Sequence, residues 1–259
     1  MSKDRAAISP PASSPAWLRV LLRNRSAVIG GIFIFVMLVL SLLGPMLYQS
    51  IDSPELRQSR NGIYQDYNAI NARPSFEHWL GTDYLGRDTL TRLLHAVRVS
   101  LLVAFVVEII NVGLGGGLGL LAGYFGGWLD VLISRIADML FAFPGILLAI
   151  LISAIFGARA RELYGATGRL LLVAGALSLV SWPLMARLVR SETLSLKSRE
   201  FILASRALGA SSTRLILRHV LPNVIWLIIV AATLDVAGVI VNEATLSLLG
   251  LGIEEPGAS

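Results

Sequence analysis

Four ionisable residues lie within or beside strongly apolar stretches of the chain: Glu108, Arg135, Asp138 and Asp235. A charge at the centre of a helix in a bilayer costs about 2.5–3.5 kcal/mol on insertion scales, so each such group needs a partner or a water-filled cavity. Asp235 is the most central of them within its stretch. It could bind an amino group in a pathway, or it could pair with a cation on a neighbouring helix, and the residues leave both interpretations open.

Asp138 and a further acid, Glu243, also have simpler interpretations. Arg135 and Asp138 are three residues apart, which places them together on one helix face, so a local pair at the start of a helix is favoured over a pathway role for Asp138. Glu243 follows the last long apolar stretch. It could close a gate at the far side of a membrane, meet a partner there, or be an ordinary acid at the membrane surface.

Other kinds of chemistry have no residues to support them. The chain has no cysteine, and His78, His95 and His219 are too far apart for metal-ligand spacing. It has no G-x-x-x-x-G-K-[ST] motif to hold a phosphate. Residues 117–122 read G-x-G-x-x-A, but a dinucleotide site requires a strand and a soluble βαβ unit around that motif. We therefore identify no catalytic residue, and we expect no metal and no cofactor.

The glycines of the same region have a structural explanation. Gly113 and Gly117, Gly115 and Gly119, and Gly119 and Gly123 are each four residues apart. Small residues at this spacing give a membrane helix a narrow face that lets a neighbouring helix approach closely. We predict that these glycines pack helices together.

A polar, basic segment at residues 199–223 separates two long apolar stretches. It places Phe201, Leu203, Ala204, Ala207 and Leu208 at helical spacing. Gly209 predicts the end of this short helix in a left-handed conformation, and Pro222 predicts the start of the next helix. Such a helix could lie on lipid headgroups, but docking of a soluble partner is favoured, with Glu200 and Arg206 as polar contacts.

The elements that position these residues are expected to be membrane helices. The chain is 55% hydrophobic and only 15% charged, with a mean hydropathy of +0.71, whereas soluble domains carry roughly 25% charged residues. The formal charge of +5 is attributed to the excess of Lys and Arg in cytoplasmic segments, not to binding of nucleic acid. Five stretches approach the roughly 20 residues that a crossing needs: 27–47, 100–122, 139–157, 170–189 and 224–241. The densest Lys and Arg clusters place the N-terminus and the loop between the last two stretches in the cytoplasm.

Several motifs resemble one transporter family. Ala204, Gly209 and Leu221-Pro222 resemble the EAA loop of ABC-importer permeases, although Leu203 stands where the family has Glu and His219 where it has Ile. The run GTDYLGRD at 81–88 is similar to the GTDxxGRD signature of the second permease subunit of dipeptide, oligopeptide and nickel importers. Residues 120–130, 135–144 and 243–252 match the same family. The GTDYLGRD run also reads as a self-contained, salt-bridged turn, which we favour over a contact with another subunit.

The resemblance implies an all-α integral membrane protein, a polytopic helical bundle of the type I ABC-importer kind with five spans. Its domains would be a cytoplasmic tail (1–26), a first transmembrane helix (27–47), an outer loop (48–99) and a permease core (100–259) whose coupling loop covers 190–222. Implied partners are a homologous second permease, two ATP-binding subunits, an extracytoplasmic solute-binding protein, a peptide substrate and the lipid bilayer of the bacterial inner membrane. The residues implied in ATPase coupling are Glu200, Ala204, Arg206 and Gly209. Those considered for the pathway or its gates are Asp138, Asp235 and Glu243.

Two alternatives remain open at this point. A proton-coupled secondary transporter would use Glu108 or Asp235 as a relay, but it predicts an internal repeat, and the sequence shows none. The family also continues past the position of Ser259 into another membrane helix, so we expect a truncated or fragmentary permease. The second alternative is therefore that the chain is an inactive permease or a static membrane anchor.

Overall fold

The computed structural model describes residues 25–50 and 65–253. The predicted cytoplasmic tail up to residue 24, the first part of the outer loop and the chain's last residues lie outside this range. Three continuous helical stretches are long and apolar enough to cross a membrane: Thr89–Phe125, Gly145–Lys197 and Ser212–Leu248. A shorter apolar stretch, Val28–Gly44, lies within α2. Residues 1–97 and 98–259 form two units, and each is described by itself.

The first unit contains helix α2 (Arg25–Ser50), the loop from 65 to 88, and the start of α4 (Thr89–Ile110). Helix α4 begins well before the predicted residue 100. Asp88 is the reason, because its Oδ1 accepts a hydrogen bond of 2.8 Å from the backbone N–H of Thr91 and so caps the helix. The stretch interpreted as loop up to residue 99 therefore includes three turns of helix.

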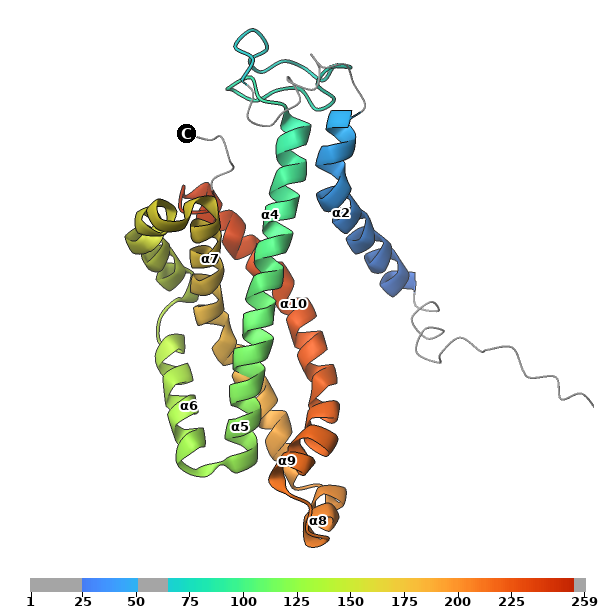
Figure 1. The fold of residues 1–259 in the computed structure, drawn as a ribbon, viewed down its shortest axis with the longest axis vertical. Helices are drawn as coiled ribbons and strands as arrows, with labels where there is room; N and C mark the ends of the chain where they lie inside the picture. Colours follow the sequence, from blue (N-terminus) through green and yellow to red (C-terminus); the bar gives the residue numbers. More distant parts are fainter. Residues whose placement is uncertain (1–24, 51–64, 254–259) are drawn as a thin grey trace, which may run out of the picture. The chain divides into compact units, whose positions relative to one another are not determined.

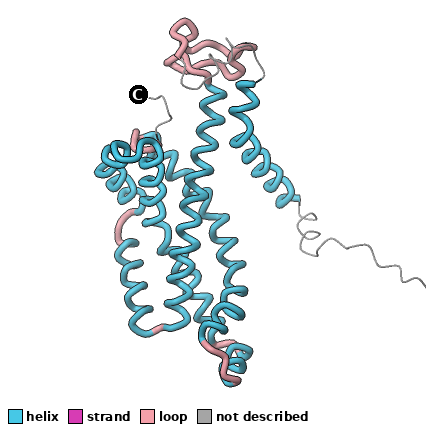
Figure 2. The backbone as a smooth tube through the Cα atoms, in the orientation of Figure 1, coloured by secondary structure: helices cyan, strands magenta, loops and turns pink. Residues whose placement is uncertain are grey.

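The second unit is built around α7. Helix α4 continues through the π-helical turn η1 (Asn111–Gly116) into α5 (Gly117–Phe125). Gly126 and Gly127, with φ angles of 68° and 62°, then reverse the chain into α6 (Gly127–Phe141). Figure 1 shows α5 and α6 running side by side in opposite directions, joined by this turn. Figure 2 shows how few of these residues lie in loops.

Helix α7 (Gly145–Lys197) carries both the third and the fourth predicted spans. Its two arms are separated at Gly165, where φ is 61° and ψ is −147°, so the crossings are distinct although the helix is nominally continuous. The predicted start of the third span at residue 139 was wrong. Pro144 precedes the helix with an extended ψ of 115°, and residues 127–141 form the separate helix α6.

The chain returns through a short helical elbow. Helix α8 (Glu200–Ala207) is followed by α9 (Ser212–Leu215), the π-helical turn η2 (Ile216–Val220) and α10 (Leu221–Leu248). Pro222 lies in the first turn of α10, as predicted, where its missing N–H costs no helical hydrogen bond. Figure 1 shows α8 at one end of α10, and Leu248 is the last residue at the other end.

The glycine spacing in η1 and α5 has the predicted packing role at three of its positions. Added Cβ atoms on Gly115, Gly119 and Gly123 would collide with the backbone of α7 at Trp182, Ala186 and Arg190 respectively. The backbones of α5 and α7 therefore approach each other as closely as only glycine permits. Gly113 and Gly117 have no atom within 4 Å of an added Cβ, so the prediction was wrong for that pair.

Candidate functional site

Helix α8 is held against the bundle by a single buried side chain. Ile202 is 0% exposed and belongs to an apolar cluster with Tyr124 of α5, Leu196 of α7, and Leu215 and Val220 from the segments that follow. Ile202 was not predicted from the sequence, because the neighbouring apolar residues were predicted to form the functional face of this helix. Ile202 therefore places α8 in contact with α5 and α7.

The rest of α8 faces away from the bundle. Its exposed residues include all the predicted coupling residues together with three large apolar ones: Glu200, Phe201, Leu203, Ala204, Arg206, Leu208 and Gly209. Leu208 is 90% exposed. An apolar patch at the tip of a polar helix is typical of a surface that a partner covers.

Gly209 ends α8 as the sequence predicted. Its φ is +82°, and its N–H donates to the carbonyl of Arg206 while that of Ala210 donates to Ser205, at 3.0 and 3.1 Å. These two bonds form a Schellman motif, which satisfies carbonyls that the helix end would otherwise leave free. Nothing lies within 4 Å of an added Cβ at this glycine, so backbone conformation is the only demand on the position.

Two cations lie over the ring of Tyr124 on the same side of the bundle. Lys197 Nζ is 5.7 Å and the Arg206 guanidinium carbon 5.9 Å from the ring centroid. Contacts of this kind contribute about 0.5–1 kcal/mol at exposed sites. They link α7 and α8 to the end of α5 in addition to the apolar anchor at Ile202.

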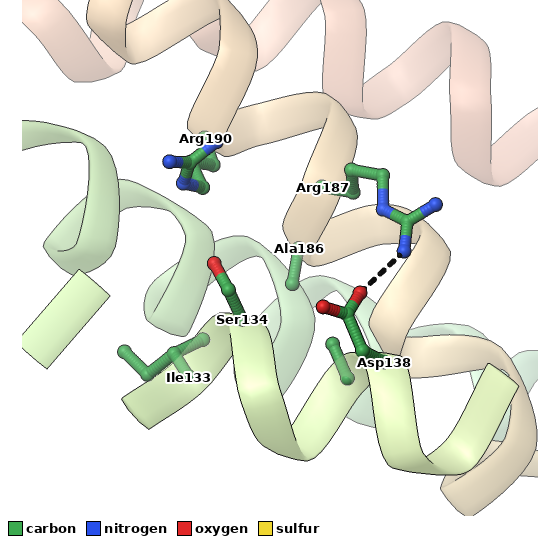
Figure 3. Close-up of a pocket in the computed structure, with 7 residues that line it drawn as sticks. Ile133, Ser134, Asp138, Ala186, Arg187 and Arg190 are labelled. Carbon is green, nitrogen blue, oxygen red and sulfur yellow. Dashed lines mark hydrogen bonds and ion pairs between the residues drawn. The ribbon is translucent and has the colours of Figure 1, made fainter. Parts of the chain in front are cut away.

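A cleft of about 320 Å³ lies between α6 and α7 (Figure 3). Asp138 on α6 accepts a hydrogen bond of 3.0 Å from Arg187 on α7, and both side chains are more than half exposed. Arg190 reaches Asp130 on α6, with Nη2 at 2.7 Å from Oδ2. The expected local pair of Asp138 with Arg135 was wrong, because Asp138 lies in the last turn of α6, where it faces α7.

Asp235 lies in a polar group between three helices. The Asn111 Nδ2 atom of η1 is 3.1 Å from Asp235 Oδ2 and 2.9 Å from Ser181 Oγ of α7. Glu108, one turn earlier, is close enough to Asp235 for the two carboxyl groups to interact. Of the two interpretations left open for Asp235, the described residues do not show the pair with a cation: the hydrogen bond to Asp235 comes from the Asn111 amide.

Glu243 is not free to meet a partner. It lies inside α10, is buried, and accepts hydrogen bonds from Ser100 of α4 at 2.8 Å and from Ser247 at 2.7 Å. The expectation that it follows the last helix was wrong, because α10 continues to Leu248. The two hydroxyl groups hold this carboxylate at the end of α10 remote from α8.

The GTDYLGRD run folds as a salt-bridged turn that also bonds to residues outside the run. Asp83 accepts hydrogen bonds from the backbone N–H groups of Leu85 and Arg87, both at 2.9 Å, and pairs with the side chains of Arg87 and Arg92. Burial alone would raise the pKa of Asp83, but these hydrogen bonds and the guanidinium charge outweigh it and hold the pKa below its usual value.

The second half of this run is anchored from within the same unit. Asp88 is fully buried and meets His78 Nδ1 at 2.9 Å and Tyr48 Oη at 3.1 Å. Gly81 and Gly86 both have φ near +72°, and an added Cβ on either would collide with a backbone carbonyl. The glycines of the motif are therefore required by turn geometry.

Comparison with known proteins identifies the family. Residues 115–255 match the family described as binding-protein-dependent transport system inner membrane component. Residues 16–74 match the N-terminal TM domain of oligopeptide transport permease C.

Three similar proteins illustrate the match. The dipeptide transport system permease protein DppC of Alkalihalophilus pseudofirmus is 40% identical over 91% of this chain and 71% of its own length. The glutathione transport system permease protein GsiD of Pectobacterium atrosepticum is 38% identical, over 93% and 73%. The oligopeptide transport system permease protein OppC of Mycobacterium bovis is 37% identical, over 93% and 77%.

These matches do not favour the self-sufficient secondary transporter or the static anchor, because the proteins named are permeases of transport systems with several components. The helical core described above, from Gly115 to the end of α10, lies inside the matched region. The chain therefore belongs to the family of inner-membrane components of binding-protein-dependent transport systems, and it is a permease subunit, not the catalytic subunit, of an ABC importer.

Proposed function

We propose that this permease carries peptides across the bacterial inner membrane, with the N-terminus and α8 on the cytoplasmic side. It pairs with a homologous second permease to form the pathway. Two ATP-binding subunits dock on α8, and an extracytoplasmic solute-binding protein delivers the peptide. The substrate assignment rests on similarity to permeases named for dipeptide, oligopeptide and glutathione transport.

The exposed tip of α8 is the observation that carries the docking proposal. This eight-residue helix buries Ile202, whereas Phe201 and Leu203 on the helix and Leu208 just after it are exposed to solvent beside Glu200 and Arg206. A short helix with an apolar tip and a polar rim fits the general anatomy of a protein interface. We assign direct ATPase contact to Glu200, Ala204 and Arg206, and the shaping of the helix end to Gly209.

Transport requires that the ATPases bind α8 differently in two states, because a partner shifts an equilibrium only by its differential affinity. Movement of α8 acts on α5 and α7 through Ile202 and Tyr124. The close glycine contacts between α5 and α7 make these helices move together. The ion pair of Asp130 with Arg190 extends the same rigid group to α6.

We propose separate roles for the three acids considered for the pathway. Asp235, in the polar group between η1, α7 and α10, faces the solute. Asp138 and Glu243 act as gate contacts near the inner and outer ends, since each joins two helices through bonds that a relative helix movement would break: Asp138 with Arg187 and Glu243 with Ser100.

Single cysteines test this orientation and the docking surface. The natural chain has no cysteine, so a cysteine introduced alone is the only thiol. Leu208→Cys and Leu248→Cys form a matched pair, because both leucines are about nine-tenths exposed, at 90% and 87%. Leu208 directly follows α8, which lies before the start of α10, and Leu248 ends α10. In the assembled transporter, a short thiol crosslinker should join Leu208→Cys to the ATPase subunit and leave Leu248→Cys unlinked to it.

A membrane-impermeant thiol reagent completes the test. It should label Leu208→Cys only from the cytoplasmic side and Leu248→Cys only from the outside. Crosslinks from Leu208→Cys to lipid alone would remove the docking proposal, and the reverse labelling pattern would remove the orientation. ATP-dependent uptake of labelled di- and tripeptides into proteoliposomes tests the substrate class separately.

A further inference from the structure

Glu108 is a buried carboxylate without a hydrogen bond in the described part of the chain. Its side chain is on α4, is 8% exposed, and neither carboxylate oxygen has a hydrogen-bond partner. Asp235 lies close enough to interact with it electrostatically. Buried carboxylates are normally paired or hydrogen-bonded, because their desolvation is otherwise uncompensated. Two neighbouring acids, one of them unsatisfied, form a site that lacks a positive charge.

The neighbouring amide cannot supply the missing bond. Asn111 has two amide hydrogens, and its Nδ2 atom already contacts Ser181 Oγ and Asp235 Oδ2 at 2.9 and 3.1 Å. Ser181 is committed as well, since its hydroxyl is 2.8 Å from the carbonyl of Leu177 and 3.1 Å from Asn111 Oδ1. Every donor of this polar group is in use, and Glu108 still needs one.

A cavity of about 280 Å³ opens onto Asp235 and Ser181 between α7 and α10. The remainder of its lining is apolar: Leu184, Met185, Leu188, Ala231 and Leu234. Its size is just below the roughly 300–1,000 Å³ of pockets for whole small ligands, so it suits one side chain of a larger solute. An apolar lining with one carboxylate, that of Asp235, matches an aliphatic stem that carries a positive group.

We propose that Glu108 and Asp235 form a subsite that selects peptides with a lysine or arginine side chain. The stem lies along Leu184, Leu188 and Leu234, and the ammonium or guanidinium group lies against the Asp235 carboxylate, with Glu108 next to it. A peptide's own amino terminus fits less well, because the backbone amides beside it would lie unsatisfied against the apolar lining. This inference rests on the proposed function as a peptide permease.

The test compares two peptides that differ only in charge. The complete transporter, with its second permease, ATPases and binding protein, is reconstituted in proteoliposomes. Uptake of Ala-Lys-Ala is compared with uptake of the same peptide carrying norleucine in place of lysine. Hydrogen bonds to charged groups are strong enough for loss of one to change binding about tenfold. Asp235→Asn and Glu108→Gln should therefore each reduce the lysine-to-norleucine uptake ratio about tenfold.

Controls separate this result from a loss of structure. Glu162→Gln removes an exposed acid of α7 that pairs with Arg159 and should leave the ratio as in the natural protein. The subsite is refuted by an unchanged ratio in both variants, or by an equal fall in uptake of both peptides. It is also refuted if both variants fail to assemble with the second permease. The two acids are then required for the contact between the permeases, and the second permease supplies their cation. Absence of ATP-dependent uptake of either peptide by the natural protein would instead refute the proposed peptide function.

Discussion

The end of α8 offers a controlled perturbation of the docking surface. Gly209 has φ of +82° with no atom within 4 Å of an added Cβ. Replacing it with alanine therefore costs only the left-handed conformation, about 1–2 kcal/mol. The chain can avoid this cost by unwinding the Schellman turn, which frees the carbonyls of Ser205 and Arg206 and moves Arg206 out of place.

The second unit contains a matched control. Gly250 ends α10 with φ of +72°, also has nothing within 4 Å of an added Cβ, and closes the same motif. Its N–H donates to Ser247 and that of Leu251 to Leu246, at 3.0 and 2.9 Å. Gly250→Ala should therefore carry the same conformational cost as Gly209→Ala, but at the opposite end of α10.

The measurement is the affinity of the ATPase subunits for the permease pair in nanodiscs. A cost of about 1–2 kcal/mol corresponds to a factor of about 5–30 in an equilibrium. Gly209→Ala should weaken association by up to that factor, Gly250→Ala should leave it unchanged, and Gly209→Asn should recover part of the loss because asparagine tolerates this conformation. Equal weakening by the two alanine variants, or none by Gly209→Ala, would refute the role of α8.

Three other perturbations test the supporting structure. Ile202→Ala should cost about 2–5 kcal/mol as a buried truncation and speed tryptic cleavage in α8, whereas Leu203→Ala, at a half-exposed position, should not. Gly119→Val should lower the melting temperature sharply, because even a Cβ there collides with the α7 backbone, while Gly117→Val has open space and should be milder. The lowered pKa of Asp83 stabilises its turn above the unfolded value near 4, and this contribution is lost as pH falls through the folded value. Proteolysis of the loop should therefore increase below about pH 4, and Asp83→Asn should abolish that dependence.

The positions of the helices, but not their ends, were predictable from the sequence. The apolar stretches predicted all fall on helices, because the length of an apolar run reports the need to satisfy backbone groups inside a membrane. The predicted ends of these helices were less accurate. Thr89 begins α4 because Asp88 caps it, a signal that hydropathy does not contain, and Pro144 divides what had been read as one span.

The residues of the candidate site were also only partly predictable from the sequence. The end of α8 at Gly209 was predictable, because a left-handed glycine after a short helical pattern is a local signal. Ile202 was missed, because only the docked position of α8 shows which of its apolar residues points inward. The sequence could have indicated Asn111, because it is a polar residue one turn after Glu108 in an apolar stretch. The sequence does not indicate which residues Asn111 contacts.

The sequence by itself determined the membrane class, the family and the position of the elbow around α8, since these depend on composition, apolar run length and short motifs. Only the tertiary structure decided which charges meet. Asp138 pairs with Arg187, 49 residues away, and Asp235 with Asn111, 124 residues away. The physical reason is that such contacts depend on how each helix is rotated about its axis and how closely its neighbour packs.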